Sequence, residues 1–220
     1  MLDDEQLKSW RDAVVAGDLP GPIRADRWQA LRAGVVNLWE FETTEYWYAD
    51  GWGQLMGSNE TGKSSLMALT TLIPWLADVA SSNIDTLGRS GKTFRYYVEP
   101  TGRDADRREA TASTHHGWLW VEYGRRTDQG EEFFPTLLFA EARGAAADMR
   151  LHWCTLSGGE RVRGGCDLLA ARRVVLPKDV TAEGFTRHPS AAAYRREVAS
   201  RLLGSTAEKL EAVGKLLRVT

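Results

Sequence analysis

The nine residues at 57–65, "GSNETGKSS", limit what this chain folds into more than any other part of its 220 residues. Four residues of this stretch satisfy the spacing G-x-x-x-x-G-K-S: Gly57, Gly62, Lys63 and Ser64. Glycines at these positions let the backbone wrap around a phosphate and turn its N–H groups inward. A strand-like segment at 53–57 precedes the loop and a helix-like segment at 63–72 follows it. The sequence therefore predicts a strand–loop–helix unit that holds the phosphates of a nucleotide.

The helix start and the side chains at this loop are predicted to have separate roles in binding the phosphates and Mg²⁺. The helix that begins near Gly62 points the positive end of its dipole at the phosphates. Lys63 is predicted to reach the β- and γ-phosphates, and the Ser64 hydroxyl to ligate Mg²⁺. We therefore expect ATP and Mg²⁺ as cofactors. The predicted nucleotide-binding residues are Gly57, Asn59, Glu60, Thr61, Gly62, Lys63, Ser64 and Ser65, with Ser64 as the metal ligand.

Composition restricts the class of protein. A hydrophobic fraction of 43% is enough for one sizeable core, and a net charge of −2 gives no overall basic field that would indicate nucleic acid. Two cysteines, Cys154 and Cys166, are too few for a disulfide framework. The polar, acidic start of the chain does not resemble a signal peptide, and the apolar run at 66–80 is too short to span a bilayer. We expect a cytoplasmic protein.

The first half of the chain has three further predicted features. Residues 4–16 fit a short amphipathic helix. The aromatic segments 33–42 and 45–51 predict strands, and Asp50-Gly51 is a typical hairpin turn pair. Pro74 is expected to end or kink the helix after the loop. Residues 81–108 are polar and rich in chain breakers, so we expect an irregular excursion there.

The second half begins with strands and ends with helices. Strand character resumes at 117–124, 133–142 and 149–155. Two apolar stripes then predict helices: the first consists of Tyr194, Val198 and Leu202, and the second of Leu210, Val213 and Leu217. The run from Ser205 to Glu208 fits a capping box for the second helix.

The stretch from "LRAGVVNLWEFETTEYWYADGWGQLMG" through "SNETGKSSLMALTTLIPWL" resembles the N-terminal half-head of SMC-like ATPases. It is most similar to the SMC-like (JetC-like) subunits of Wadjet-type anti-plasmid systems, which are relatives of MukB. The resemblance continues through "GWLWVEYGRR" and "AYRREVASRLLGSTAEKLEAVGKLLRV", and so extends over about residues 27–220. Glu60 departs from the pattern, because these loops usually have glycine at that position.

The resemblance implies an α/β fold, the N-terminal lobe of a P-loop NTPase head of the ABC/SMC type. An antiparallel β region would precede the phosphate loop, and a helical C-terminal segment would lead toward a coiled coil. The implied division is a helix and linker at 1–26, the ATPase lobe at 27–189 and the helical segment at 190–220. No strand in the sequence ends in the Asp-Glu pair of such heads. We therefore expect a fragment that is completed by a C-terminal lobe and that does not turn over ATP alone.

The implied partners follow from the same resemblance. They are that C-terminal lobe, a second head that associates on ATP, kleisin-like and accessory subunits, and DNA. The implied function is ATP binding within a DNA-translocating ATPase of a plasmid-defence type.

A second motif, "LSGGERVR" at 156–163, spells the signature of ABC ATPases. A working signature opens a helix, whereas Gly164-Gly165 follow here, and each glycine costs a helix roughly 1 kcal/mol relative to alanine. The apolar run at 172–180 contains Pro177 and lacks the Asp-Glu pair. We predict that 156–163 is an ordinary loop.

Further candidate residues are weaker. Glu122 and Gln129 are the two candidates for the position of the glutamine that contacts Mg²⁺ in ABC heads, but the sequence favours a solvent-facing strand residue and a loop residue, respectively. A solvated basic loop and a position near nucleotide or DNA remain equal alternatives for three residues: Arg89, Lys92 and Arg95. His115-His116 has no ligand partners at metal spacing, so we expect a surface turn.

Two other functions remain open at this point. One is a small P-loop kinase or stand-alone NTPase, for which the cluster "RDADRR" at 103–108 is the one candidate lid. The other is a non-catalytic module whose loop binds nucleotide while its surfaces bind a partner.

Overall fold

The computed structural model describes residues 18–25, 27–39, 41–56, 63–84, 93–99, 114–144 and 149–218, together with Lys8, Asp12 and Ala16. Within these residues the chain combines a six-stranded sheet with helices, which confirms the mixed α/β class. The strands are β1 (Gln29–Leu38), β2 (Phe41–Trp47), β3 (Thr114–Thr127), β4 (Gly130–Arg143), β5 (Arg150–Thr155), β6 (Arg161–Val162), β7 (Gly165–Cys166), β8 (Leu169–Ala170), β9 (Arg173–Val174) and β10 (Thr186–Arg187). The helices are α2 (Lys63–Leu76), α3 (Ser81–Ile84), α4 (Phe94–Val98), α6 (Ala191–Leu203) and α7 (Ala207–Arg218).

The large sheet has the strand order β10-β5-β4-β3-β1-β2, and every neighbouring pair is antiparallel. Its centre is the long hairpin of β3 and β4, which are paired from Thr114–Arg143 to Thr127–Gly130. These two strands consist largely of aromatic and aliphatic residues that suit a pleated surface buried on both sides. The short β6–β7 and β8–β9 pairs form separate two-stranded units.

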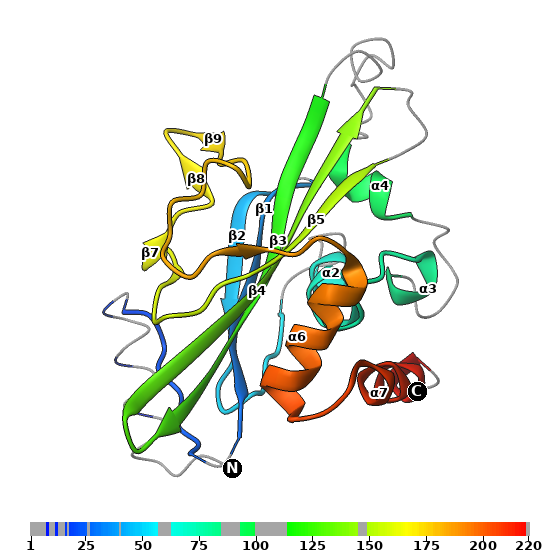
Figure 1. Ribbon diagram of the computed structural model, residues 1–220. Coiled ribbons are helices and arrows are strands. Elements are labelled where there is room, and N and C mark those ends of the chain that lie inside the picture. Colours follow the sequence, from blue (N-terminus) through cyan, green and yellow to red (C-terminus); the bar gives the residue numbers. More distant parts are fainter. Residues whose placement is uncertain are drawn as a thin grey trace.

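Helices cover one face of this sheet (Figure 1). Because side chains alternate across a strand, Leu119 of β3 points toward the helices whereas Trp118 and Trp120 point to the other face. On the helical face, α2, α4, α6 and α7 contribute to a single buried cluster with the strands. Within the predicted C-terminal segment, α6 and the first half of α7 therefore pack on the same core as the helix after the phosphate loop.

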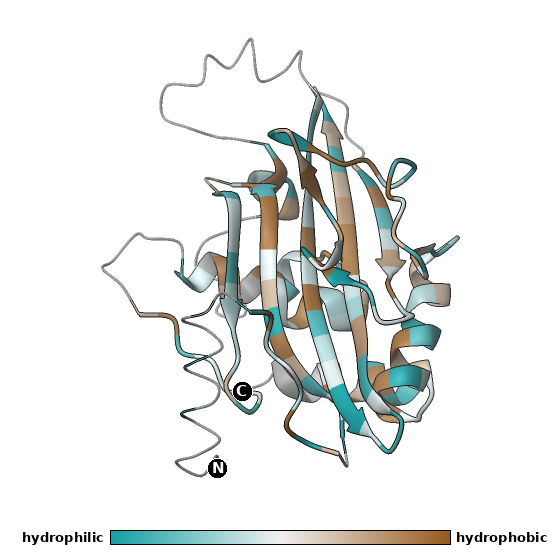
Figure 2. Cartoon of the chain, turned by 90° about the vertical axis from the view of Figure 1, so that its left-hand side faces the viewer, coloured by the Kyte–Doolittle hydropathy of each residue, from teal (hydrophilic) through white to brown (hydrophobic). Residues whose placement is uncertain are grey.

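The opposite face is covered by the chain between β5 and β10, which is drawn in front of the sheet in Figure 2. Apolar, brown segments lie in the middle of the strands there. Trp118, Trp120, Leu137 and Phe139 of the sheet pack with residues from the covering chain, which include Leu156, Val162, Cys166 and Leu168. Burial raises the pKa of both thiols in this cluster, Cys154 and Cys166, to about 12, so they remain protonated.

Most of the predicted strands and helices are confirmed, with different bounds. Strands overlap five of the six predicted segments, and the Asp50-Gly51 pair forms a tight turn with φ of 52° and 79°, closed by the bridge between Ala49 and Trp52. Ser190 caps α6 by accepting a hydrogen bond from the Ala193 N–H at 3.1 Å. The predicted helix at 4–16 lies outside the described residues, apart from three of them.

Several local predictions are wrong. Residues 53–56 do not form a strand. The last helix begins at Ala207, whereas the predicted capping box of Ser205 and Glu208 requires a start at Thr206. Thr206 therefore occupies the capping position, and its hydroxyl donates to the Glu208 carboxylate. Val213 is 39% exposed and does not continue the Leu210 stripe. Gly214 takes its place in the core, because a Cβ there would come 2.3 Å from Cδ2 of Leu76 and would push α7 away from α2.

No helix in the described ranges has the length and apolar character needed to cross a bilayer.

Candidate functional site

The predicted phosphate site begins, within the described residues, at the first turn of α2. The helix starts at Lys63, which is half-buried, and Ser64 follows at an exposed position. Gly57, Asn59, Glu60, Thr61 and Gly62 lie outside the described residues, as does the side chain of Ser65. The structure thus places the two residues with chemically active side chains together at the N-terminus of a 14-residue helix.

Packing against the sheet fixes the direction of α2. Its buried side chains recur with helical spacing and contact the cluster on the helical face: Leu66, Leu69, Ile73 and Leu76. Since Lys63 lies one turn before Leu66, the buried face also determines where the first turn of the helix is held. The N-terminal end of the helix dipole is therefore in a position defined by the core.

A line of hydroxyl groups joins α2 to the β2 side of the sheet. Thr70 Oγ1 donates to the Leu66 carbonyl at 2.8 Å, which uses its single hydrogen. The Tyr46 hydroxyl must then donate to Thr70, and its oxygen accepts from the Tyr48 hydroxyl at 2.9 Å. Burial raises the pKa of Tyr48, so its hydroxyl remains a protonated donor. The first turns of α2 are thus tied to β2 by polar contacts in addition to packing.

Pro74 does not end α2, which is one of the two effects that the sequence predicts for it. The helix continues two residues further, to Leu76, and closes with a hydrogen bond from the Ala77 N–H to the Ile73 carbonyl at 3.0 Å. The Tyr194 hydroxyl of α6 donates to the Pro74 carbonyl at 2.6 Å. This contact satisfies a carbonyl in the last turn of the helix, where no intrahelical partner is present. It therefore ties the end of α2 to α6.

The segment that leads into the loop is exposed. Leu55 packs on the core, but Trp52 and Met56 are each 82% exposed. Residues 53–56 have no strand partner in the part of the chain that the structure describes. The predicted strand before the loop is absent because there is no adjacent strand to supply its hydrogen bonds.

The residues present fit a nucleotide phosphate with Mg²⁺. An ammonium group, a hydroxyl group and the N–H groups of a first helical turn are donors and ligands suited to a phosphate and a hard cation. Lys63 and Ser64 supply the first two, and α2 supplies the third. No cluster of three or more His, Cys, Asp or Glu side chains that could hold a metal is present within the described ranges. Ser64 is thus the one metal ligand that the described part of the site offers to Mg²⁺.

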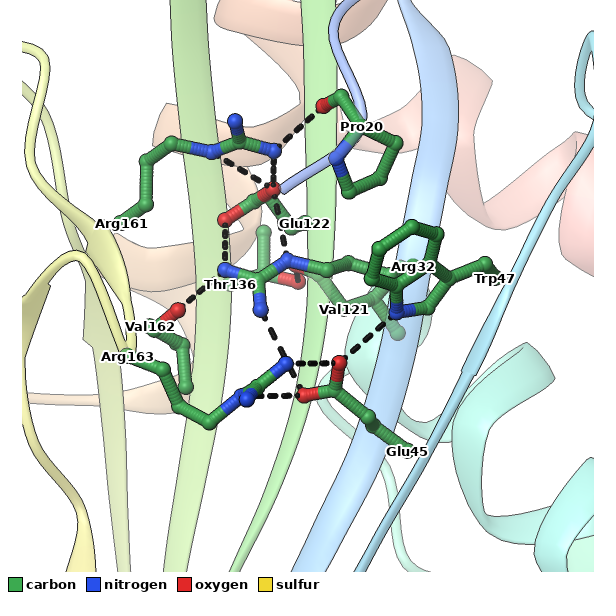
Figure 3. A network of polar contacts seen from close by, with 10 residues as sticks. All are labelled: Pro20, Arg32, Glu45, Trp47, Val121, Glu122, Thr136, Arg161, Val162 and Arg163. Carbon is green, nitrogen blue, oxygen red and sulfur yellow. Dashed lines mark hydrogen bonds and ion pairs between the residues drawn. The ribbon is translucent and has the colours of Figure 1, made fainter. Parts of the chain in front are cut away.

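Glu122 lies in a buried ion-pair network, not at a metal site (Figure 3). Its carboxylate is 0% exposed and accepts hydrogen bonds from Arg32 at 3.0 and 2.8 Å. Arg161 donates to the same carboxylate from the other side, with Nε at 3.0 Å. Glu122 and Arg32 are directly paired across β3 and β1, so both point to the face away from the helices. The prediction that Glu122 faces solvent is wrong, and its oxygens are already occupied by guanidinium groups.

The network extends to the segment after the glycine turn. Arg161 donates to the Pro20 carbonyl at 2.6 Å, and Arg32 donates to the Val162 carbonyl. Arg163 pairs with Glu45 of β2, which also receives the Trp47 indole N–H at 2.7 Å. The network therefore fastens the covering chain and the N-terminal linker to the strands that they cross.

The signature-like segment at 156–163 is a loop, as the sequence analysis predicted. Gly158 and Gly159 form a turn with φ of 86° and 95°, and the short strand β6 follows it. Ser157 lies beside Gly184, where a Cβ would be 2.1 Å from the Ser157 carbonyl oxygen. No helix begins here, so the segment does not present a helix N-terminus to a nucleotide.

Gln129 is exposed in the two-residue turn between β3 and β4, where its N–H bonds Thr127 Oγ1 at 3.3 Å. This turn is at the far end of the long hairpin from α4 (Figure 1). Arg95 is engaged with Glu99 at 3.0 Å and with the Gly144 carbonyl. Arg89 and Lys92 lie outside the described residues. The structure thus brings none of the described weaker candidates into the first turn of α2.

The two adjacent histidines are in a strand, not in the predicted surface turn. His115 and His116 belong to β3, and the His116 ring stacks on Phe139 with centroids 5.7 Å apart. Burial lowers the pKa of His116, which is therefore neutral near pH 7. The structure gives this histidine a packing role on the face opposite the helices.

Arg32, Glu45 and Arg161 are the residues that sequence reasoning missed. The signal for Arg32 was present, because it interrupts an otherwise apolar strand segment, and a charge in a buried strand requires a partner. Nothing local to the sequence identified that partner, since Glu122 is 90 residues away.

Comparison with known proteins adds no further assignment: neither protein-family models nor curated proteins gave a match to this chain.

Proposed function

We propose that this chain is the ATP-binding N-terminal half-head of an SMC-like, DNA-translocating ATPase of a plasmid-defence type. One observation supports this most directly: the motif G-x-x-x-x-G-K-S leads into α2 at Lys63, and α2 is fixed on a sheet that contains the predicted antiparallel strands.

In this proposal each residue has a defined task. The first-turn N–H groups and the dipole of α2 attract the phosphates, and Lys63 neutralises charge on the β- and γ-phosphates. Ser64 contributes one oxygen ligand to Mg²⁺. Loop residues 57–62 would wrap the phosphates with their backbone. Thr70 and Tyr46 hold the helix in register with β2, so they act as positioning residues.

The remaining parts of the site would come from other elements. We propose that a C-terminal lobe supplies further Mg²⁺ ligands and the group that orients water, and that a second head associates when ATP is bound. Kleisin-like and accessory subunits and DNA belong to the same proposed assembly. The exposed Trp52 and Met56 next to the loop support a further packing partner at this end of the molecule.

A compact, self-sufficient NTPase is less well supported. That alternative requires 156–163 to act as a signature helix, whereas these residues form a turn and a short strand. It also requires a free carboxylate near the metal, whereas the Glu122 carboxylate is saturated by two arginines.

Calorimetric titration with a non-hydrolysable ATP analogue and Mg²⁺ tests nucleotide binding. We expect measurable affinity in the unaltered chain and loss of at least tenfold in Lys63→Ala. Lys178→Ala is the matched control, because Lys178 is exposed on a turn of the other face. Equal affinity in all three proteins would refute the proposal.

Phosphate release from the isolated chain tests whether it is a half-head. Electrostatic groups of the missing kind contribute about 3–4 kcal/mol each, so losing two or three would reduce turnover toward background. Robust turnover that disappears in Lys63→Ala would instead establish a stand-alone NTPase. Nucleotide binding without turnover, even with a supplied C-terminal lobe, would favour the non-catalytic module.

A further inference from the structure

A cavity lies on the face opposite the helices, away from α2. It has a volume of about 500 Å³ and lies where the β1–β2 connection and the start of β3 meet the β8–β9 hairpin. Its lining residues are Asn37, Glu42, His116, Leu169, Arg172, Arg173, Val174 and Leu176. A volume of this size is in the range of sites for small molecules.

The β8–β9 hairpin presents two arginines to this cavity through an unfavourable turn. The two central residues, Ala171 and Arg172, both have positive φ, 48° and 61°. Turns of this class favour asparagine and glycine, because other residues are strained in the left-handed region. The turn places Arg172 and Arg173 side by side at the cavity wall. Strain of this kind is typical of positions that bind ligands.

Neither arginine has a carboxylate partner within the ranges that the structure describes. This distinguishes them from Arg32 and Arg161, which are neutralised by Glu122. Among the described residues of the wall, Glu42 is the single acidic one, so these residues together have one excess positive charge when His116 is neutral. Each guanidinium group offers a pair of parallel N–H donors that matches the two oxygens of a carboxylate or a phosphate.

The rest of the wall is mainly apolar. Leu169, Val174 and Leu176 give it an apolar surface. Nδ1 of His116 is enclosed without a hydrogen-bond partner, and the Asn37 side chain donates to the His116 carbonyl at 2.6 Å. The cavity therefore joins an apolar wall and an imidazole edge to a cationic rim.

We propose that this cavity binds a small organic acid, that is, a carboxylate or phosphate monoester attached to an apolar group. The arginine pair holds the anion and the three aliphatic side chains hold the apolar part. A nucleic-acid backbone fits less well, because it would bring its phosphates to Glu42 and leave the apolar wall unfilled. This site is independent of the proposed nucleotide site, which lies on α2.

Two probes of equal size separate charge from shape: 4-phenylbutyrate and the neutral 4-phenylbutyramide. Binding is followed by NMR on the methyl groups of Leu169, Val174 and Leu176. The test variant is Arg172→Gln/Arg173→Gln, which removes both charges but keeps unbranched, polar side chains. The control variant is Arg196→Gln/Lys209→Gln, which removes the same charge from exposed positions on α6 and α7.

We expect 4-phenylbutyrate to shift these methyl signals saturably and the amide to bind at least tenfold more weakly. The affinity for the acid should fall by about tenfold or more in the test variant, the loss expected for charge-assisted hydrogen bonds, and by less than twofold in the control. Absence of saturable shifts, or equal losses in both variants, would overturn the proposal. Inorganic phosphate or a short DNA duplex that competes at lower concentration than the acid would also overturn it, in favour of a plain anion site or a nucleic-acid contact.

Discussion

The buried carboxylate of Glu122 permits a sharp test of how the two layers on the sheet are held together. Glu122→Gln retains the shape of the side chain. However, the guanidinium groups of Arg32 and Arg161 lose the negative charge that they share, and the Glu122 side chain is 0% exposed to solvent. Removing one partner of a buried ion pair costs about 3–5 kcal/mol. At about 2–4 °C per kcal/mol for a chain of this length, the melting temperature should fall by roughly 6–20 °C.

Urea unfolding followed by tryptophan fluorescence measures the change directly, because Trp118 and Trp120 lie on the same face of the sheet. The control is Glu132→Gln. Glu132 pairs with Arg125 at 2.8 Å, but its side chain is 43% exposed, and such pairs contribute at most about 1 kcal/mol. The slope of unfolding free energy with urea should be unchanged in both variants.

Two results would contradict this reasoning. A cost below 1 kcal/mol in Glu122→Gln would mean that the carboxylate is not paired as described. Unchanged stability together with weaker Mg²⁺-dependent nucleotide binding would instead assign Glu122 to the metal site.

Three further changes have defined outcomes. Gly184→Ala should cost more stability than Gly158→Ala, because both have positive φ but a Cβ at Gly184 would be 2.1 Å from a backbone oxygen whereas Gly158 faces open space; thermal melting compares them. Tyr46→Phe should cost about 1 kcal/mol by removing its bond to Thr70 and should weaken nucleotide binding, as calorimetry would show, whereas unchanged affinity would exclude a positioning role. Burial lowers the pKa of His188 below the unfolded value near 6.5, so the unfolded chain binds more protons between those two values. Stability should therefore be complete above pH 6.5 and fall on acidification, and His188→Gln should flatten this dependence in urea titrations at several pH values.

The sequence predicted elements whose pattern is local. The strands β3, β4 and β5 were found from continuous aromatic and aliphatic runs, and the turn at 50–51 from its residue pair. The motif G-x-x-x-x-G-K-S predicted the helix that follows it. Gly164 and Gly165 indicated that 156–163 is a loop and does not open a helix. In each case the neighbouring residues alone determine the preference.

The predictions that failed depend on residues distant in the chain. The helix α2 continues two residues past Pro74, and Tyr194, 120 residues later, bonds the Pro74 carbonyl. Glu122 is buried because arginines at positions 90 residues before it and 39 residues after it neutralise it. Segment 53–56 lacks the adjacent strand that its composition would favour. The spacing of hydrophobic residues and their secondary-structure propensities do not identify such distant partners.

The fastening of the covering chain has a consequence for synthesis. The Arg32 guanidinium meets the Val162 carbonyl across 130 positions, and Arg161 meets Pro20 across 141. At about 5–20 residues per second, a ribosome needs roughly 7–26 s to deliver the second partner after the first. During that interval Arg32 lacks its carbonyl acceptor at Val162, and Glu122 has only one of its two guanidinium partners, so the native network is not complete until the chain has passed residue 162. Folding of this lobe should therefore be late and concerted, and nascent chains that end before β6 should be preferred clients of chaperones.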